Sequence, residues 1–148
     1  MIERAEVLED FTPYLINRII ARYNKGVESA LKAAGVSVAQ MRALAVLAEA
    51  EPCTINELSV LTVIKQSTLS RTLDNMEQAG LIRREARDSD NRYRRISLTP
   101  AGYEAYKTAW PAMLAMQDTM LNALDPTERV TLNKLLVRVF YDIRHHEF

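Results

Sequence analysis

The stretch from Thr54 to Thr99 constrains the fold more than any other part of this chain. It holds two short helical patterns in succession and then two strand-like runs. Thr54 and Glu57 have the spacing of a capping box, so the first helix is expected to begin after Thr54. The second helix is expected over about 65–79, and it is followed by Gly80, a residue suited to the left-handed conformation at helix ends. The stretch therefore predicts a helix-turn-helix that leads into a β-hairpin.

The second of these helices has two faces that differ in chemistry. Its apolar residues are spaced four and three apart, so they share one side and are expected to pack inward with the apolar residues of the first helix. The inward residues are Leu69, Leu73 and Met76 of the second helix and Ile55, Leu58 and Leu61 of the first. The outward arc holds Ser67, Arg71, Asp74 and Gln78. Hydroxyl, amide and arginine side chains suit base edges and phosphates in a DNA major groove. The residues expected at DNA from this helix are Gln66, Ser67, Thr68, Ser70 and Arg71.

The strand-like runs LIRREA and RYRRISL flank a polar, turn-forming loop and carry much of the positive charge. Residues 83–95 hold six arginines and three acidic residues. A basic hairpin that protrudes beside such a helix predicts a winged helix-turn-helix. We expect some of these arginines, Arg87 and Arg94 among them, to meet DNA phosphates and others to pair with Glu85 or Asp88.

These motifs resemble those of the MarR family of transcriptional regulators. QSTLSRTLDNMEQAGLI is similar to the recognition helix of the family, and DNRYRRISLTPAG is similar to its wing. The resemblance covers nearly the whole chain, and the flanking helices match mainly in position and length. It implies that Asp90 braces the wing and that Arg92 enters the minor groove. It also implies DNA contacts from Ser67, Thr68 and Arg71.

The chain on either side of this module reads as helix, over about 8–34, 37–51, 99–124 and from Asp125 onward. The first and last of these segments have more apolar residues than a monomer of this size needs. The residues concerned are Phe11, Leu15, Leu132, Leu136, Val139, Phe140 and Tyr141. Periodicity alone is consistent with either a dimer interface or a larger core, and the family resemblance favours the dimer.

The expected fold class is therefore mainly α with a small β-hairpin wing, a winged helix-turn-helix flanked by N- and C-terminal dimerisation helices. We expect a single domain over 1–148, in which 37–99 form the DNA-binding module and 100–110 begin a long connecting helix. Residues 1–34 and 111–148 are expected to form the dimerisation helices. A two-fold dimer would place its two recognition helices about 34 Å apart and would require a pseudo-palindromic DNA site.

The distribution of charge agrees with a DNA-binding module even though the net charge is zero. Residues 52–99 hold eight basic and six acidic residues, whereas each flanking segment has one acidic residue in excess. Affinity for DNA should therefore depend on salt concentration. No apolar run approaches the roughly 20 residues of a membrane span, and the acidic start does not resemble a signal peptide, so a soluble, cytoplasmic protein without membrane association is expected.

The sequence lacks the motifs of an enzyme. It has neither a Gly-rich phosphate loop nor a Gly-x-Ser-x-Gly motif, so no catalytic residue is assigned. His145 and His146 are adjacent and cannot face one metal ion from a regular helix, so no metal and no cofactor is expected. Cys53 has no second cysteine to pair with and is expected to be a small buried residue rather than a redox sensor.

The family resemblance also implies a small effector, often a phenolic or aromatic acid, bound between the dimerisation helices and the DNA-binding module. The candidate lining residues are Tyr14, Asn17, Arg18, Arg22, Met41 and Trp110. Arginine suits a carboxylate, tyrosine and tryptophan suit a ring, and methionine forms an adaptable wall. Alternatively, Met41 and Trp110 belong to the core and the arginines to the surface.

The leading hypothesis is a homodimeric repressor that binds double-stranded DNA and is released by such a ligand. The alternative is a winged-helix module that uses the same helix to bind another protein and does not bind DNA.

Overall fold

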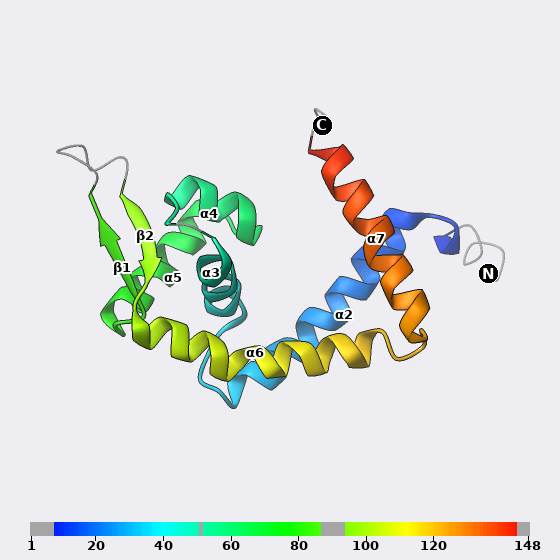
Figure 1. Ribbon diagram of the computed structural model, residues 1–148, viewed down its shortest axis with the longest axis horizontal. Helices are drawn as coiled ribbons and strands as arrows, with labels where there is room; N and C mark the ends of the chain where they lie inside the picture. The colour runs from blue at the N-terminus through cyan, green and yellow to red at the C-terminus, as the bar shows by residue number, and fades with distance from the viewer. Residues whose placement is uncertain (1–7, 51, 87–93, 145–148) are drawn as a thin grey trace.

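The computed structural model describes residues 8–50, 52–86 and 94–144. In chain order the elements are α2 (Thr12–Lys32), α3 (Val38–Glu49), α4 (Ile55–Thr62), α5 (Gln66–Gln78), β1 (Ile82–Glu85), β2 (Arg95–Leu98), α6 (Pro100–Met120) and α7 (Pro126–Ile143) (Figure 1). The expected fold class is confirmed, since the described chain is mainly helical with one two-stranded hairpin after α5. The candidate residues Arg87, Asp90 and Arg92, the acidic residue Asp88 and the histidine pair 145–146 lie outside the described residues.

Short side-chain caps fix where most helices begin. Ser37, Thr54 and Asp125 each accept a hydrogen bond from the backbone N–H three residues on, and the side chain at that position accepts one in return. These reciprocal bonds satisfy backbone N–H groups that a helix end would otherwise leave without partners. Thr99 caps α6 in the same way with its hydroxyl alone, just before Pro100. All four of these starts are those that the sequence predicts.

The core lies inside the helix-turn-helix and extends to α2 and α6. Its largest fully buried side chains are Val27, Leu31, Met41, Leu44, Leu58, Leu69, Leu73, Met76 and Ile96. The predicted inward face of α5 is confirmed, because Leu69, Leu73 and Met76 are all fully buried. Burial of this stripe holds α5 against α3 and α4 and turns its polar side to the surface.

The wing is a short antiparallel hairpin in which Ile82 pairs with Leu98. The segment before α4 joins it, because Cys53 and Ile96 exchange two backbone hydrogen bonds of 3.2 and 2.8 Å. The wing is thus tied to the start of the helix-turn-helix as well as to its end. The Cys53 side chain is buried, as predicted, and this burial, followed by the charge of Glu57, raises the pKa of its thiol. A raised pKa disfavours the reactive thiolate.

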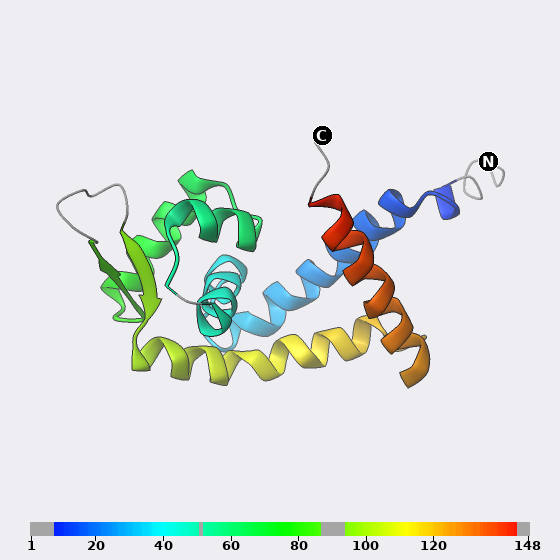
Figure 2. The ribbon, with the colours of Figure 1, turned by 45° about the horizontal axis from the view of Figure 1, so that its top comes forward.

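The helix α6 connects the winged module to the terminal helices. Figures 1 and 2 both show the module at one end of α6 and α7 beyond the other, with α2 packed along α6 between them. The helix continues through Pro111 and ends at Met120, four residues before the predicted end. Arg129 of α7 reaches back to Asp118 of α6, with 2.9 Å between Nη1 and Oδ1.

Two further sequence predictions about helices are corrected by the structure. The main N-terminal helix begins at Thr12 and not at Leu8, because Pro13 occupies its first turn, where proline is favoured. Leu61 is not buried but 54% exposed, since the inward stripe of α4 continues from Leu58 to Thr62, one residue further on. The Thr62 hydroxyl is tolerated inside because it donates to the Leu58 carbonyl at 2.6 Å.

The apolar residues that the sequence assigns to a dimer interface are mostly at the surface of the single chain. Phe11, Leu15, Leu136, Val139, Phe140 and Tyr141 are exposed, and Leu132 is half-buried. The helix α7 contains no buried residue. On α2 the apolar series changes character along the helix, because Leu15 and Ile19 are exposed whereas Val27 and Leu31 are fully buried. These residues therefore do not fill the core of one chain.

Candidate nucleic-acid interface and effector cleft

The polar face of α5 is open to solvent, as the sequence predicts. Of its candidate DNA contacts, Gln66, Ser67, Thr68 and Arg71 are exposed and Ser70 is half-buried. The N-cap residue Lys65 makes no side-chain cap bond, in contrast to the capped starts of α3, α4, α6 and α7. The first backbone N–H groups of α5 are thus available to an outside acceptor, and helix N-termini attract phosphate.

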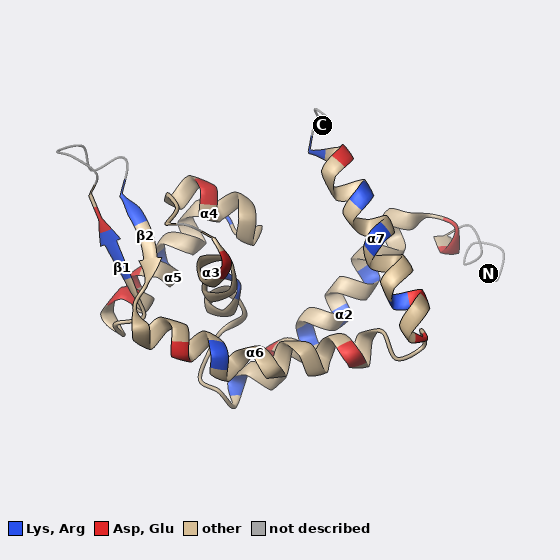
Figure 3. Cartoon of the chain, in the orientation of Figure 1, with Lys and Arg blue, Asp and Glu red and all other residues tan. Residues whose placement is uncertain are grey.

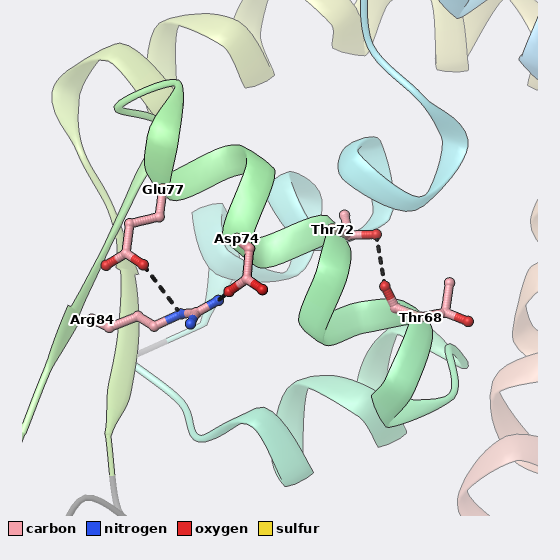
Figure 4. A network of polar contacts seen from close by, with 5 residues as sticks. All are labelled: Thr68, Thr72, Asp74, Glu77 and Arg84. Carbon is pink, nitrogen blue, oxygen red and sulfur yellow. Dashed lines mark hydrogen bonds and ion pairs between the residues drawn. The ribbon is translucent and has the colours of Figure 1, made fainter.

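Internal hydrogen bonds orient part of this face. The Gln66 amide donates to Asn56 Oδ1 of α4 at 2.5 Å, which ties the two helices of the helix-turn-helix together at their surface. The Thr72 hydroxyl donates to the Thr68 carbonyl at 3.0 Å (Figure 4). Arg71 is exposed on this surface between Thr68 and Thr72. Arg71 is therefore accessible to an outside partner near the middle of the helix.

Basic residues gather on both wing strands (Figure 3). The predicted pairing of some wing arginines with acidic groups is seen for Arg83, whose Nε lies 3.2 Å from Glu85 Oε1. Arg84 instead crosses to α5, with 2.8 Å between its Nη2 and Asp74 Oδ1. Arg95 donates to the Pro52 carbonyl. Sequence reasoning missed the last two contacts because their partners lie far along the chain or in the backbone.

Arg94, the candidate residue directly before β2, is exposed. Asp74 and Gln78 share the outward side of α5, as predicted, and are also exposed. Arg71 and Arg94 are therefore both exposed, one on α5 and the other directly before β2.

A cleft of about 1020 Å³ lies between α2 and α6. Its cationic side chains come from one face of α2 and its apolar wall comes from both helices. The lining includes Arg18, Arg22, Lys25, Ile19, Tyr23, Met116, Thr119 and Met120. Burial raises the pKa of the Tyr23 hydroxyl, an effect that the charge of Arg42 partly opposes, so this hydroxyl remains a neutral donor. Three cations beside thioether and aromatic groups match a small ligand with a negative charge and an apolar ring.

The structure brings together only part of the predicted effector site. Arg18 and Arg22 line this cleft, and the Arg18 guanidinium donates to the Tyr14 hydroxyl at 3.1 Å. Asn17 is exposed on the same helix. The other two candidates, Met41 and Trp110, do not line this cleft. Met41 is fully buried in the core.

Trp110 is half-buried and packs against the core, with its ring centroid 5.4 Å from that of Tyr106. The cleft is also lined by Lys25, Met116 and Met120, which the sequence analysis did not include among its candidates. The spacing of Arg18, Arg22 and Lys25 by four and three was a signal for Lys25, whereas the methionines come from another helix.

A second cleft, of about 780 Å³, lies between α2, α3 and the turn into α5. Lys25 lines both clefts, and the second one extends to Ile64 and Thr68 at the start of the recognition helix. Arg42 of α3 donates to Asn24 Oδ1 of α2 at 3.3 Å along this boundary. The two clefts therefore lie next to each other on α2, and the second borders the first turn of α5.

The described residues show two further negative results. Within 8–50, 52–86 and 94–144, no group of three or more His, Cys, Asp or Glu side chains is placed to hold a metal ion. No helix in the described part of the chain combines the length and apolar character needed to cross a membrane.

The pair α4–α5 followed by the basic hairpin defines a winged helix-turn-helix protein. Residues 34–92 match the sequence model of the MarR family. A MarR-family transcriptional regulator from Silicibacter pomeroyi, known from a crystal structure, is 43% identical to this chain with a TM-score of 0.83, and the alignment covers 97% of this chain and 98% of that one. The chain belongs to the MarR family of transcriptional regulators, and it is a regulator and not an enzyme.

Two further relatives are informative. The HTH-type transcriptional repressor IacR of Pseudomonas putida is 25% identical over 135 residues, which are 91% of this chain and 81% of the relative. A MarR family protein of Mycobacterium tuberculosis, solved in complex with salicylic acid, is 23% identical with a TM-score of 0.74 and covers 86% of this chain and 95% of its own. The same protein has been solved in complex with DNA. At this identity, the likeness to the mycobacterial protein shows the fold alone.

Proposed function

We propose that this protein binds a pseudo-palindromic site on double-stranded DNA as a homodimer and represses transcription from it. The observation that carries the proposal is the outward face of α5, where hydroxyl, amide and arginine side chains are exposed beside two basic strands. Arginine bonds guanine O6 and N7 together, and glutamine pairs with adenine, so such a face reads base edges. Because the regulator acts on DNA, the proposal includes a cytoplasmic location.

The apolar surface of the terminal helices supports the dimer. No residue of α7 is buried within the described chain, and its apolar residues Leu136, Val139 and Phe140 are all exposed. Exposed apolar surface of this extent marks an interaction site in a protein of this size. A second copy is the natural partner, because a two-fold axis through the terminal helices would present two winged modules to one DNA duplex.

A small aromatic acid is the proposed effector, and the cleft between α2 and α6 is its proposed site. Arg18 and Arg22 would pair with the carboxylate, and Met116 would contact the ring. The mycobacterial protein of the same fold was solved with salicylic acid, which is an acid of this kind. Since Lys25 borders both clefts, a ligand in the first would bias the position of α2 against Thr68 of α5. Release from DNA requires that the ligand bind one arrangement of the dimer better than the other.

A second candidate function is docking to another protein. It is supported by Val60, Leu61 and Val63, which are exposed at the end of α4 and in the following turn. The face of α5 itself speaks against it, since its exposed side chains are polar. The two functions separate in the experiment below.

The test is selection of duplexes from a random-sequence library by the purified protein, followed by a fluorescence-anisotropy titration. We expect a selected duplex with two related half-sites one helical turn apart, bound by two copies of the chain and much more tightly than its scrambled version. An equal and weak affinity for all duplexes would contradict the proposal and favour protein docking.

A further inference from the structure

Arg84 joins the wing to the recognition helix. It lies on β1, and its Nη2 donates to Asp74 Oδ1 of α5 at 2.8 Å. Its Nε lies 3.7 Å from Glu77 Oε2, one turn further along the same helix (Figure 4). Only 18% of the Arg84 side chain is exposed, against 56% for Asp74 and 44% for Glu77. The guanidinium is therefore inserted between β1 and α5 and does not lie on the outer surface.

The neighbouring arginine behaves differently. Successive strand residues point to opposite sides of a hairpin, so Arg83 faces away from α5. Its side chain is 61% exposed, and its Nε contacts Ser97 and Glu85, both within the wing. Of these two arginines, Arg84 alone connects the wing to the helix.

The position of this contact along the chain makes it a geometric constraint. The helix α5 ends at Gln78 and β1 begins at Ile82, so a short turn is all that joins them covalently. A second tie at Arg84, two residues into the strand, fixes the angle between helix and wing as well as their point of contact. A winged helix needs that angle, because the helix and the wing engage different parts of the duplex at the same time.

The contact also balances charge at the DNA-facing side. Asp74 shares the outward arc of α5 with Ser67 and Arg71. A carboxylate there would repel the phosphates that the arginines attract, unless a cation accompanies it. Arg84 supplies that cation from the wing at hydrogen-bond distance.

We propose that Arg84 is a positioning residue for DNA recognition, which sets the angle between α5 and the wing and neutralises Asp74 and Glu77 beside the interface. It acts through α5 and the wing without contacting a base. This inference rests on the proposed DNA binding, but its effect on the protein alone is measurable separately.

The experiment compares Arg84→Gln with the matched control Arg83→Gln, since both remove one positive charge from the same strand. Anisotropy titrations use the selected duplex and its scrambled version. We expect Arg83→Gln to reduce the affinity for both duplexes slightly and equally. On the selected duplex, Arg84→Gln should reduce affinity about tenfold more than the control does. A coupling of this size is typical of residues in one network. Equal effects of the two variants on both duplexes would overturn the proposal.

A triple variant separates geometry from charge. Arg84→Gln combined with Asp74→Asn and Glu77→Gln removes the tie and the two carboxylates together. We expect it to restore affinity for the scrambled duplex while the preference for the selected duplex stays reduced. Recovery of both would show that charge balance alone matters and would contradict the positioning role. Arg84→Lys keeps the charge but lacks the planar fork, so part of the preference should be lost even in this conservative variant.

Amide hydrogen exchange tests the tie without DNA. Residues 74–78 and 82–85 should exchange faster in Arg84→Gln than in Arg83→Gln, because the contact that holds helix and strand together is missing. Unchanged exchange would count against the proposal. If the wild type prefers no duplex, the proposed function fails, and the exchange result still decides whether Arg84 holds the two elements.

Discussion

Gly102 lies directly against the backbone of Leu81. A Cβ atom added at Gly102 would stand 1.9 Å from the Leu81 carbonyl oxygen, far inside van der Waals contact. The Leu81 carbonyl also accepts a hydrogen bond from the Thr99 N–H at 3.0 Å, and the Thr99 hydroxyl donates to the Gly80 carbonyl. The first turn of α6 is thus fixed to the turn between α5 and β1. Movement of α6 is therefore coupled to the recognition helix and the wing.

Gly102→Ala should destabilise the fold and weaken DNA binding together. The new methyl group has to push back a backbone carbonyl, and overpacking of this kind costs on the order of 1–3 kcal/mol or more. Gly26→Ala is the matched control, because its Cβ would meet only the end of the flexible Met116 side chain, 2.4 Å away. Chemical denaturation measures the stability of the two variants, and an anisotropy titration measures their DNA binding. An equal loss of stability in the two variants would mean that α6 adjusts at Leu81 as easily as Met116 does.

Leu136→Asp combined with Phe140→Asp should convert the proposed dimer into a folded monomer. Both side chains are exposed in the single chain, so a charge there leaves the core intact but disrupts an apolar interface. Sedimentation velocity gives the mass and circular dichroism the helix content. Val60→Asp, at an even more exposed apolar site on the winged module, is the control and should leave the mass unchanged. A dimer that survives the double substitution would place the interface elsewhere.

Arg22→Gln should reduce the ability of salicylate to release the protein from its selected duplex. Arg22 lines the cleft between α2 and α6, and loss of one charge-assisted bond corresponds to roughly a tenfold higher ligand concentration. The control is Lys107→Gln on α6. The Lys107 side chain lies outside the cleft and pairs with Glu104, which is also exposed. If salicylate acts on Arg22→Gln as on the wild type, the proposed site is incorrect.

Glu57 should make the stability of the helix-turn-helix depend on acidic pH. Its carboxylate accepts from the Thr54 N–H at 2.7 Å, and this bond, with that from the Thr54 hydroxyl, lowers the pKa of Glu57 below its usual 4.5. A lowered pKa contributes stability that is present above pH 4.5 and is lost as the pH falls through the lower folded-state value. The difference in melting temperature between wild type and Glu57→Gln should therefore shrink below that pH. A constant difference from pH 7 to pH 3 would show that the charge of Glu57 plays no part.

Local signals in the sequence predicted most of the elements. The capping pairs at Thr54 and Asp125 and the apolar spacing of Leu69, Leu73 and Met76 depend on neighbours within one or two turns, so the sequence displays them directly. One exception was the start of α2, where a continuous apolar spacing concealed the effect of Pro13. Another was the end of α6 at Met120, four residues before the predicted end.

Contacts between distant segments were not predictable in this way. The sequence shows Arg84 as one arginine in a basic run, and its pairing with Asp74 appears only when β1 packs beside α5. Met41 and Trp110 were candidates for the effector site by chemistry alone, whereas the packing of α3 and α6 places one in the core and the other against it. Helical periodicity shows that residues share a face, but it does not show which neighbour covers that face. Only the structure shows that no residue of α7 is buried within the described chain.

The most direct test of the account is an anisotropy titration of wild type and Arg71→Ala against the selected duplex and its scrambled version. Arg71 stands exposed in the middle of the α5 face, where a bidentate contact to guanine would be made. We predict that Arg71→Ala loses about 1–3 kcal/mol of binding free energy on the selected duplex and much less on the scrambled one. Wild-type affinity of Arg71→Ala for the selected duplex would show that α5 is not the element that reads DNA.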